Sequence, residues 1–176
     1  MAFLVVGYPD LHSEDASWIE SFRDDHDTLH RAVVGAHFTL VFPTDALSAE
    51  EFVAHVHQCV SGARRIEFVL RSALVLPDHF IDASHVFLVP DEGNSAFIKL
   101  HDRLYRGSLA GELRLDIPYI PHLGVASNAR SVVCKALVDQ LNDIDLAIEG
   151  RVSELAISAY DGYRVQTLAT ATLSQE

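Results

Sequence analysis

A pattern that occurs twice constrains this chain more than any other feature: an apolar strand segment that contains one histidine, followed by an amphipathic helix. The first copy spans residues 33–61 and the second spans residues 119–143. The copies match in pattern and not in residue identity. Elsewhere, strand-like pairs and helix-like segments alternate irregularly. This order favours an α+β fold with antiparallel sheets over a doubly wound parallel sheet.

Apolar periodicity and turn residues predict the other elements. Helix N-termini are marked by motifs such as Ser48-x-x-Glu51, a capping box. Asp161-Gly162 predicts a tight hairpin turn near the end of the chain. The expected strands cover residues 3–8, 32–42, 64–76, 84–90, 119–126, 146–162 and 163–173, and the expected helices cover 11–27, 47–60, 94–107 and 128–143. In the last helix, Val132, Val133, Ala136, Leu137 and Leu141 are expected to face inward.

Length and charge limit the class of protein. A chain of 176 residues fits one domain, or one domain made of two small lobes. Its net charge of −12 argues against coating long nucleic acid, because such binding neutralises many phosphates, but it permits a small anionic ligand or an RNA end. The N-terminal apolar run is too short for a membrane span or signal peptide, so we expect a cytoplasmic protein without a membrane partner.

Each histidine segment is predicted to present its histidine away from the core. Residues two apart in a strand share a face. His37, Thr39 and Val41 are therefore expected on one face, with Phe38, Leu40 and Phe42 directed to the core. In the second copy, His122, Gly124 and Ala126 share a face, and Leu123 and Val125 face inward. A cleft is the expected environment, because a buried neutral histidine needs partners for both ring nitrogens.

The stretches "HFTL" at residues 37–40 and "HLGV" at residues 122–125 resemble the paired His-x-(Thr/Ser)-x motifs of the 2H phosphoesterase superfamily, which includes 2′-5′ RNA ligase-like and cyclic phosphodiesterase proteins. The two histidines are 85 positions apart, and the resemblance covers nearly the whole chain. It implies one domain over residues 1–176 with a bilobal, pseudo-twofold fold. In such a fold, antiparallel sheets with outer helices surround a central groove.

The resemblance also implies a reaction. Family members open 2′,3′-cyclic phosphates, hydrolyse related cyclic or 2′-5′ phosphodiesters, or join RNA ends, without a metal or other cofactor. Histidine suits this chemistry because it can act as acid or base near neutral pH. In this scheme His37 and His122 are the acid–base pair, with either assignment open, and Thr39 contacts phosphate. We therefore expect a monomeric hydrolase of nucleotides or RNA ends in RNA processing, which does not bind long double-stranded nucleic acid.

Gly124 departs from the family pattern, which has Thr or Ser there. Without a hydroxyl, a backbone N–H or a water must make the second phosphate contact. Ser127 has the wrong strand parity to replace it unless the strand bends. The alternative function is therefore a non-catalytic member that binds a nucleotide or RNA through a degenerate second motif.

Aromatic side chains are further candidates, because they can stack on a nucleobase. The candidates for stacking on a base are Tyr8, Tyr119 and Tyr163. Of these, Tyr163 is predicted to contact the substrate from the hairpin turn. Tyr119 has the parity of Leu123, which points away from the site.

Other histidines offer a weaker alternative, a metal-dependent hydrolase. His26 and His30 could face one metal if their segment is helical, but no third ligand is evident. His79, His85 and His101 are expected on the surface or in hairpins.

Overall fold

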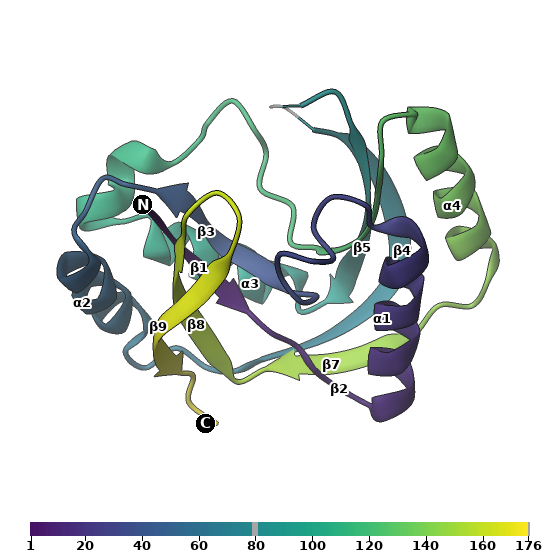
Figure 1. Ribbon diagram of the computed structural model, residues 1–176. Coiled ribbons are helices and arrows are strands. Elements are labelled where there is room, and N and C mark those ends of the chain that lie inside the picture. The colour runs from purple at the N-terminus through teal and green to yellow at the C-terminus, as the bar shows by residue number, and fades with distance from the viewer. Residues whose placement is uncertain (79–80, 176) are drawn as a thin grey trace.

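The computed structural model describes residues 1–78 and 81–175, and its strands form two antiparallel sheets (Figure 1). The first sheet has the order β3-β1-β8-β9, and the second has the order β2-β7-β4-β5-β6. Strands of the first sheet are β3 (Phe38–Thr44), β1 (Ala2–Gly7), β8 (Glu154–Tyr160) and β9 (Val165–Thr172). Strands of the second are β2 (Asp10–Leu11), β7 (Ile148–Val152), β4 (Ile66–Pro77), β5 (Ser84–Glu92) and β6 (Leu123–Asn128).

Helices cover the outside of these sheets, which confirms the predicted α+β class. In Figure 1, α2 and α4 lie at opposite sides of the molecule. α2 packs against α3 and β9, α4 packs on β4, β5 and β6, and α1 lies against β6. The helices are α1 (Ser13–His26), α2 (Ala49–Val60), α3 (Asn94–Leu104) and α4 (Ser131–Asp143), with a short 3-10 helix at Gly107–Glu112. Among the described residues, no helix is long and apolar enough to cross a membrane.

The predicted repeat corresponds to two similar arrangements. β3 is the edge strand of the first sheet and leads to α2, whereas β6 is the edge strand of the second sheet and leads to α4. His37 and His122 each stand directly before their edge strand. The capping box of Ser48 and Glu51 is formed at the start of α2. Each half of the molecule therefore supplies one histidine motif from a sheet edge.

An aromatic cluster joins the two sheets in the core. Phe38 of β3 stacks on Phe97 of α3 with ring centroids 4.1 Å apart. Phe68 of β4 meets the edge of Phe38 at 5.0 Å. All three rings are buried. Because Phe38 follows His37 directly, this cluster also anchors the first motif.

Two expected strands have different boundaries. The first histidine strand begins at Phe38, after a turn region that ends near residue 34, and not at residue 32. The expected strand over residues 146–162 is two strands, and β7 pairs with β4 while β8 pairs with β1. The chain changes sheets at Ser153, between buried Val152 and Leu155. Apolar periodicity continues through this change because both strands have buried faces.

Two predicted side-chain orientations are wrong for physical reasons. The pairing of β3 with β1 contains register shifts on both sides of Val5. Because a bulge breaks strict alternation, Leu40 and Val41 are both buried and Phe42 is 43% exposed. In α4, Val132 is 67% exposed, and the inward face consists of Cys134, Val138 and Leu141.

Two of the histidines expected on the surface or in hairpins are described by the structure. His85 lies in the β4–β5 hairpin, as expected, but is buried, and His101 is buried in α3 and lies in neither expected place. His85 Nε2 lies 2.8 Å from an Asp78 carboxylate oxygen, and His101 Nδ1 lies 3.0 Å from the Leu40 carbonyl oxygen. These partners allow a histidine to be buried without a lost hydrogen bond. His79 lies outside the described residues.

Candidate active site

His37 is held in one orientation by its neighbours. Its Nδ1 lies 2.8 Å from the Gly35 carbonyl oxygen. A carbonyl oxygen can only accept, so Nδ1 carries the hydrogen and donates it, and Nε2 has a lone pair when the ring is neutral. Among the described residues, no hydrogen bond engages Nε2. This nitrogen can therefore accept a proton, or donate one when the ring is charged.

His122 repeats this geometry. Its Nδ1 donates to the Ile120 carbonyl oxygen at 2.6 Å, again two residues earlier in the chain. Leu123, the next residue, is fully buried, as Phe38 is after His37. One face of the His122 ring stacks on Phe87 of β5, with centroids 3.6 Å apart and an interplanar angle of 14°. The ring is thus fixed by a hydrogen bond, a stack and a buried neighbour.

The environment favours the neutral form of both rings. Burial is the main cause that lowers the pKa of His122 to about 4; the hydrogen bond to Ile120 opposes this shift in part, and the charges of His37 and His85 add to it. Burial also lowers the pKa of His37, partly offset by the bond to Gly35, with Arg23 and His30 contributing. Both shifts favour the neutral imidazole over the charged imidazolium in the unliganded protein.

Thr39 and Gly124 occupy equivalent positions two residues after the histidines, but they differ chemically. Thr39 is half-buried in β3 and pairs with Val6 of β1. Gly124 pairs with Phe87 of β5. A Cβ atom built on Gly124 would lie 3.9 Å from the nearest atom of the Phe87 ring, an ordinary contact distance. Side chains around Gly124 therefore leave room for a Cβ atom.

Tyr119 connects the two motifs, which the strand parity did not predict. Its hydroxyl donates to the Thr39 carbonyl oxygen at 2.9 Å, and its ring stacks on His101 with centroids 3.6 Å apart. His101 in turn donates from Nδ1 to the Leu40 carbonyl oxygen. Tyr119 lies before the start of β6, so the alternation used for the prediction does not apply to it.

The other aromatic candidates differ in position. The Tyr8 ring is 41% exposed and lies edge-on to His37, with centroids 6.3 Å apart. Tyr163 is 81% exposed in the turn between β8 and β9, where Gly162 has a positive φ of 97°. Its backbone N–H donates to Asp161 Oδ1 at 2.8 Å. The expected hairpin turn is confirmed, while contact between Tyr163 and a substrate stays a prediction.

Ser127 is not available to replace the missing hydroxyl. It is fully buried, its Oγ donates to Asp27 Oδ1 at 3.0 Å, and the Leu29 N–H donates to the same Oγ at 3.1 Å. Asp27 also accepts from the buried Arg23 guanidinium, at 3.1 Å. This network ties the end of α1 to β6 and uses Ser127 as a structural link.

The weaker alternative, a metal-dependent hydrolase, required His26 and His30 to face one metal from the same helix. α1 ends at His26, so His30 lies beyond the helix, and the His26 ring packs on Phe22. Within residues 1–78 and 81–175, no three His, Cys, Asp or Glu side chains are grouped as metal ligands would be.

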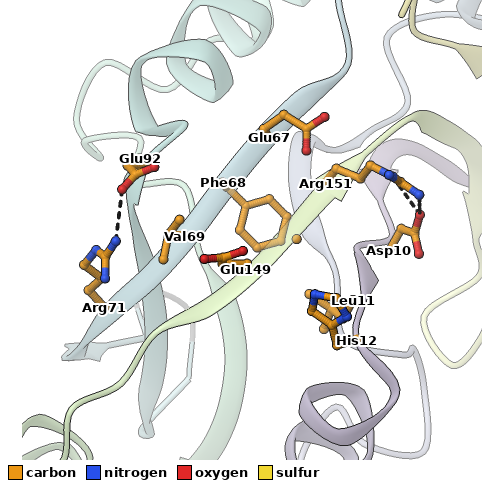
Figure 2. A pocket seen from close by; sticks show the side chains of 11 residues that line it. Asp10, Leu11, His12, Glu67, Phe68, Val69, Arg71, Glu92, Glu149 and Arg151 are labelled. Atoms are coloured by element: carbon orange, nitrogen blue, oxygen red, sulfur yellow. Dashed lines mark hydrogen bonds and ion pairs between the residues drawn. The ribbon is translucent and has the colours of Figure 1, made fainter.

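A pocket of about 450 Å³ lies away from the two motifs, on β2, β4 and β7, and neither motif histidine lines it. Figure 2 shows Arg151 directed at Asp10 and Arg71 directed at Glu92. Because Arg151 and Arg71 pair with these carboxylates, and Glu67 and Glu149 add further negative charge to the lining, this pocket does not suit an anionic ligand.

Comparison with known proteins adds a family and a fold. The family model described as 2′-5′ RNA ligase superfamily matches residues 9–164, a range that includes both histidine motifs. No curated protein matches the chain.

Solved structures with the same fold include Escherichia coli LigT in its apo form, 18% identical with a TM-score of 0.57, covering 99% of this chain and 98% of LigT. TT0787 of Thermus thermophilus is 16% identical with a TM-score of 0.60, covering 98% of each chain. Usb1 of Kluyveromyces marxianus is 16% identical with a TM-score of 0.54, also covering 98% of each. Because the family model spans most of the chain, this protein belongs to the 2′-5′ RNA ligase superfamily of 2H phosphoesterases.

Proposed function

We propose that this protein is a metal-independent phosphodiesterase that acts on 2′,3′-cyclic or 2′-5′-linked phosphodiesters of nucleotides or RNA ends. His37 and His122 are the general acid and base. One observation carries the proposal: both rings donate from Nδ1 to the carbonyl two residues earlier, which leaves Nε2 of each ring available. LigT has been solved in complex with 3′-AMP and with ATP, so a relative of this fold holds nucleotides.

The proposed reaction needs one neutral and one protonated histidine. The neutral ring takes a proton from water as the water oxygen bonds to phosphorus. The bond between phosphorus and the leaving ribose oxygen breaks, and the imidazolium gives its proton to that oxygen. Burial favours the neutral form of both histidines in the unliganded protein, but a bound phosphodiester anion favours the charged form of a nearby ring. Substrate binding thereby helps to produce the acid.

Residues near the histidines are proposed to bind the phosphate and the rest of the substrate. In this proposal the Thr39 hydroxyl donates to a phosphate oxygen, and at Gly124 only the backbone or a water is left to make the matching contact. Tyr163 is proposed to contact the substrate from the β8–β9 turn. A monomeric state, a cytoplasmic location and a role in RNA processing stay predictions from the sequence.

Gly124 supports a second candidate function, a binding protein without turnover. The missing hydroxyl removes a contact of the kind whose loss slows an oxyanion site about 10²- to 10³-fold. A protein that retained the two motif strands and lost this contact would bind a nucleotide or RNA end and hydrolyse it very slowly.

Turnover of the four nucleoside 2′,3′-cyclic phosphates in the presence of EDTA tests the proposal. We expect hydrolysis by the wild type and a loss of about 10²- to 10⁴-fold in kcat for His37→Ala and for His122→Ala. His57→Ala is the matched control, because His57 is exposed on α2 and away from both motifs.

Three results would count against a metal-independent phosphodiesterase that uses both histidines. Loss of wild-type activity in EDTA would indicate a metal-dependent hydrolase. Unchanged activity in either motif variant would exclude that histidine from catalysis. Nucleotide binding without turnover would favour the binding protein.

A further inference from the structure

The segment that leads to the first histidine has no regular structure of its own. Residues 28–37 form neither helix nor strand, and Gly35 within them supplies the carbonyl that accepts from His37 Nδ1. Glycine restricts the backbone less than any other residue. The orientation of the His37 ring therefore depends on the contacts that hold this segment in place.

A buried ion pair holds the segment at two points. The Arg23 guanidinium donates to Asp27 Oδ2 from Nε at 3.3 Å and from Nη2 at 3.1 Å, and the same Nη2 donates to the Val34 carbonyl at 2.8 Å. Asp27 Oδ1 accepts from the His30 N–H at 3.1 Å. Both charged side chains are buried. Since Val34 directly precedes Gly35, the ion pair fixes the peptide group next to the carbonyl that orients the histidine.

The same network reaches the strand of the second histidine motif. Ser127 of β6 lies five residues after His122. Its Oγ donates to Asp27 Oδ1 at 3.0 Å and accepts from the Leu29 N–H at 3.1 Å. Its carbonyl oxygen accepts from Thr28 Oγ1 at 3.3 Å. The segment of the first motif is therefore attached to the strand of the second motif.

The second histidine is oriented by a stiffer piece of chain. His122 also donates from Nδ1 to a carbonyl two residues earlier, that of Ile120. Pro118 and Pro121 flank this carbonyl, and each proline fixes the backbone φ at its own position. The chain over residues 28–37 contains no proline. It depends instead on side chains from α1 and β6 to hold one conformation.

Stability alone does not account for this buried ion pair. Moving two charges out of water costs about as much as their attraction returns, and apolar pairs of similar volume are often at least as stabilising. What Arg23 and Asp27 add is direction, because they bind backbone groups of a segment that lies outside any helix or strand. Such contacts select one backbone conformation out of many.

We propose that the network of Arg23, Asp27 and Ser127 is a positioning unit of the active site. It fixes the ring of His37 relative to that of His122. The inference rests on the proposed function, because it assigns the network a role in the same reaction. In this role the three side chains do not touch the substrate and act through the backbone that precedes the first histidine.

Two variants weaken the network without leaving a buried charge unpaired. Ser127→Ala removes the hydroxyl, and Arg23→Lys keeps the positive charge but loses the planar fork that binds Asp27 and the Val34 carbonyl together. A shift of about 1 Å in a reacting group can cost about 10²-fold in rate. We therefore expect kcat for a 2′,3′-cyclic nucleotide to fall by about 10- to 100-fold in each variant, with little change in KM.

Nitrogen NMR of the imidazole rings reports the position of His37 without any reaction. At mildly alkaline pH, Nδ1 carries the hydrogen in both neutral motif rings of the wild type. Signals are assigned by their absence in His37→Ala and His122→Ala. In Ser127→Ala and Arg23→Lys, the His37 ring should show a mixture of tautomers, while the His122 ring keeps its hydrogen on Nδ1. A change confined to His122 would show a local defect of β6 and would overturn the proposal.

Asn142→Ala is the matched control, because it also removes a side chain that holds a backbone segment from the end of a helix. Asn142 Oδ1 accepts from the Ala73 N–H at 2.7 Å, and Nδ2 donates to the Ala73 carbonyl at 3.0 Å. This variant should have the kcat and the ring signals of the wild type. An equal loss of kcat in the control would overturn the positioning role, and so would unchanged His37 signals in both network variants, whatever their kcat.

The ring signals also keep this inference distinct from the proposed reaction. If the wild type hydrolyses no cyclic nucleotide, the proposed phosphodiesterase fails, and the network is judged by NMR alone. A mixture of His37 tautomers in both network variants, and not in Asn142→Ala, then supports the positioning unit. A single His37 tautomer in all of these variants overturns it.

Discussion

At the scale of single residues, Gly124 is the position where the chain departs from its family pattern. The structure leaves space there to restore a side chain. A Cβ there meets nothing closer than 3.9 Å. We therefore expect Gly124→Ser to fold and, by supplying a hydroxyl to the phosphate, to raise kcat/KM for a 2′,3′-cyclic nucleotide by about tenfold or more. Gly124→Ala adds the Cβ without the hydroxyl and should not increase the rate. An equal gain in both variants would assign the effect to backbone stiffness.

The half-buried motif histidines also predict how stability depends on pH. In the unfolded chain a histidine titrates near pH 6.5, whereas burial lowers the pKa of His122 to about 4 in the folded protein. As the pH falls from about 6.5 to 4, the unfolded chain takes up a proton that the folded chain does not, so the free energy of unfolding decreases. In urea unfolding at pH 7 and pH 5, His122→Gln should lose less stability than the wild type. Equal losses would show that His122 is not shielded from protonation.

At the scale of elements, the free edge of β3 is capped by side chains from other segments. The Tyr119 hydroxyl donates to the Thr39 carbonyl, His101 donates to the Leu40 carbonyl, and the Phe42 N–H donates to the Tyr105 hydroxyl at 3.0 Å. Exposed edge groups otherwise pair with water or with another strand. Tyr119 also lies three residues before His122. Its hydrogen bond to Thr39 therefore fixes the position of the first motif strand relative to the second motif.

Tyr119→Phe tests this coupling, because it removes one hydrogen bond and keeps the ring stacked on His101. We expect the free energy of unfolding to fall by about 0.5–1.5 kcal/mol. We also expect kcat to fall several-fold with little change in KM. Tyr160→Phe is the control, since it removes a hydrogen bond of the same 2.9 Å length, to the Gly162 carbonyl. A similar fall in kcat in both variants would contradict a positioning role for Tyr119.

At the scale of the whole molecule, the two sheets share one aromatic cluster, formed by Phe38, Phe68 and Phe97. A single domain of two lobes, predicted from the sequence, should therefore unfold in one transition. Fluorescence of Trp18, the one tryptophan of the chain, and far-UV circular dichroism should give the same urea midpoint. Phe97→Ala should lower the stability reported by both probes by about 3–5 kcal/mol. Separate midpoints would show that the lobes unfold independently.

Local patterns in the sequence predicted much of this molecule. Apolar spacing and the capping box at Ser48 located the helices, Asp161-Gly162 located the hairpin, and the two His-x-(Thr/Gly)-x stretches pointed to the family that the comparison found. Each of these signals acts between residues close together in the chain. Helix caps, turn conformations and strand alternation can therefore be deduced from the order of residues alone.

The tertiary structure decided everything that depends on distant partners. The bulges of β3 that bury Val41 and expose Phe42 arise from its pairing with β1, and the change of sheet at Ser153 depends on β4 and β1. Tyr119 meets Thr39 across 80 positions of sequence, and Phe87 stacks on His122 from a neighbouring strand. Such contacts have no local signature, because alternation shows which residues share a face and not which segment covers that face.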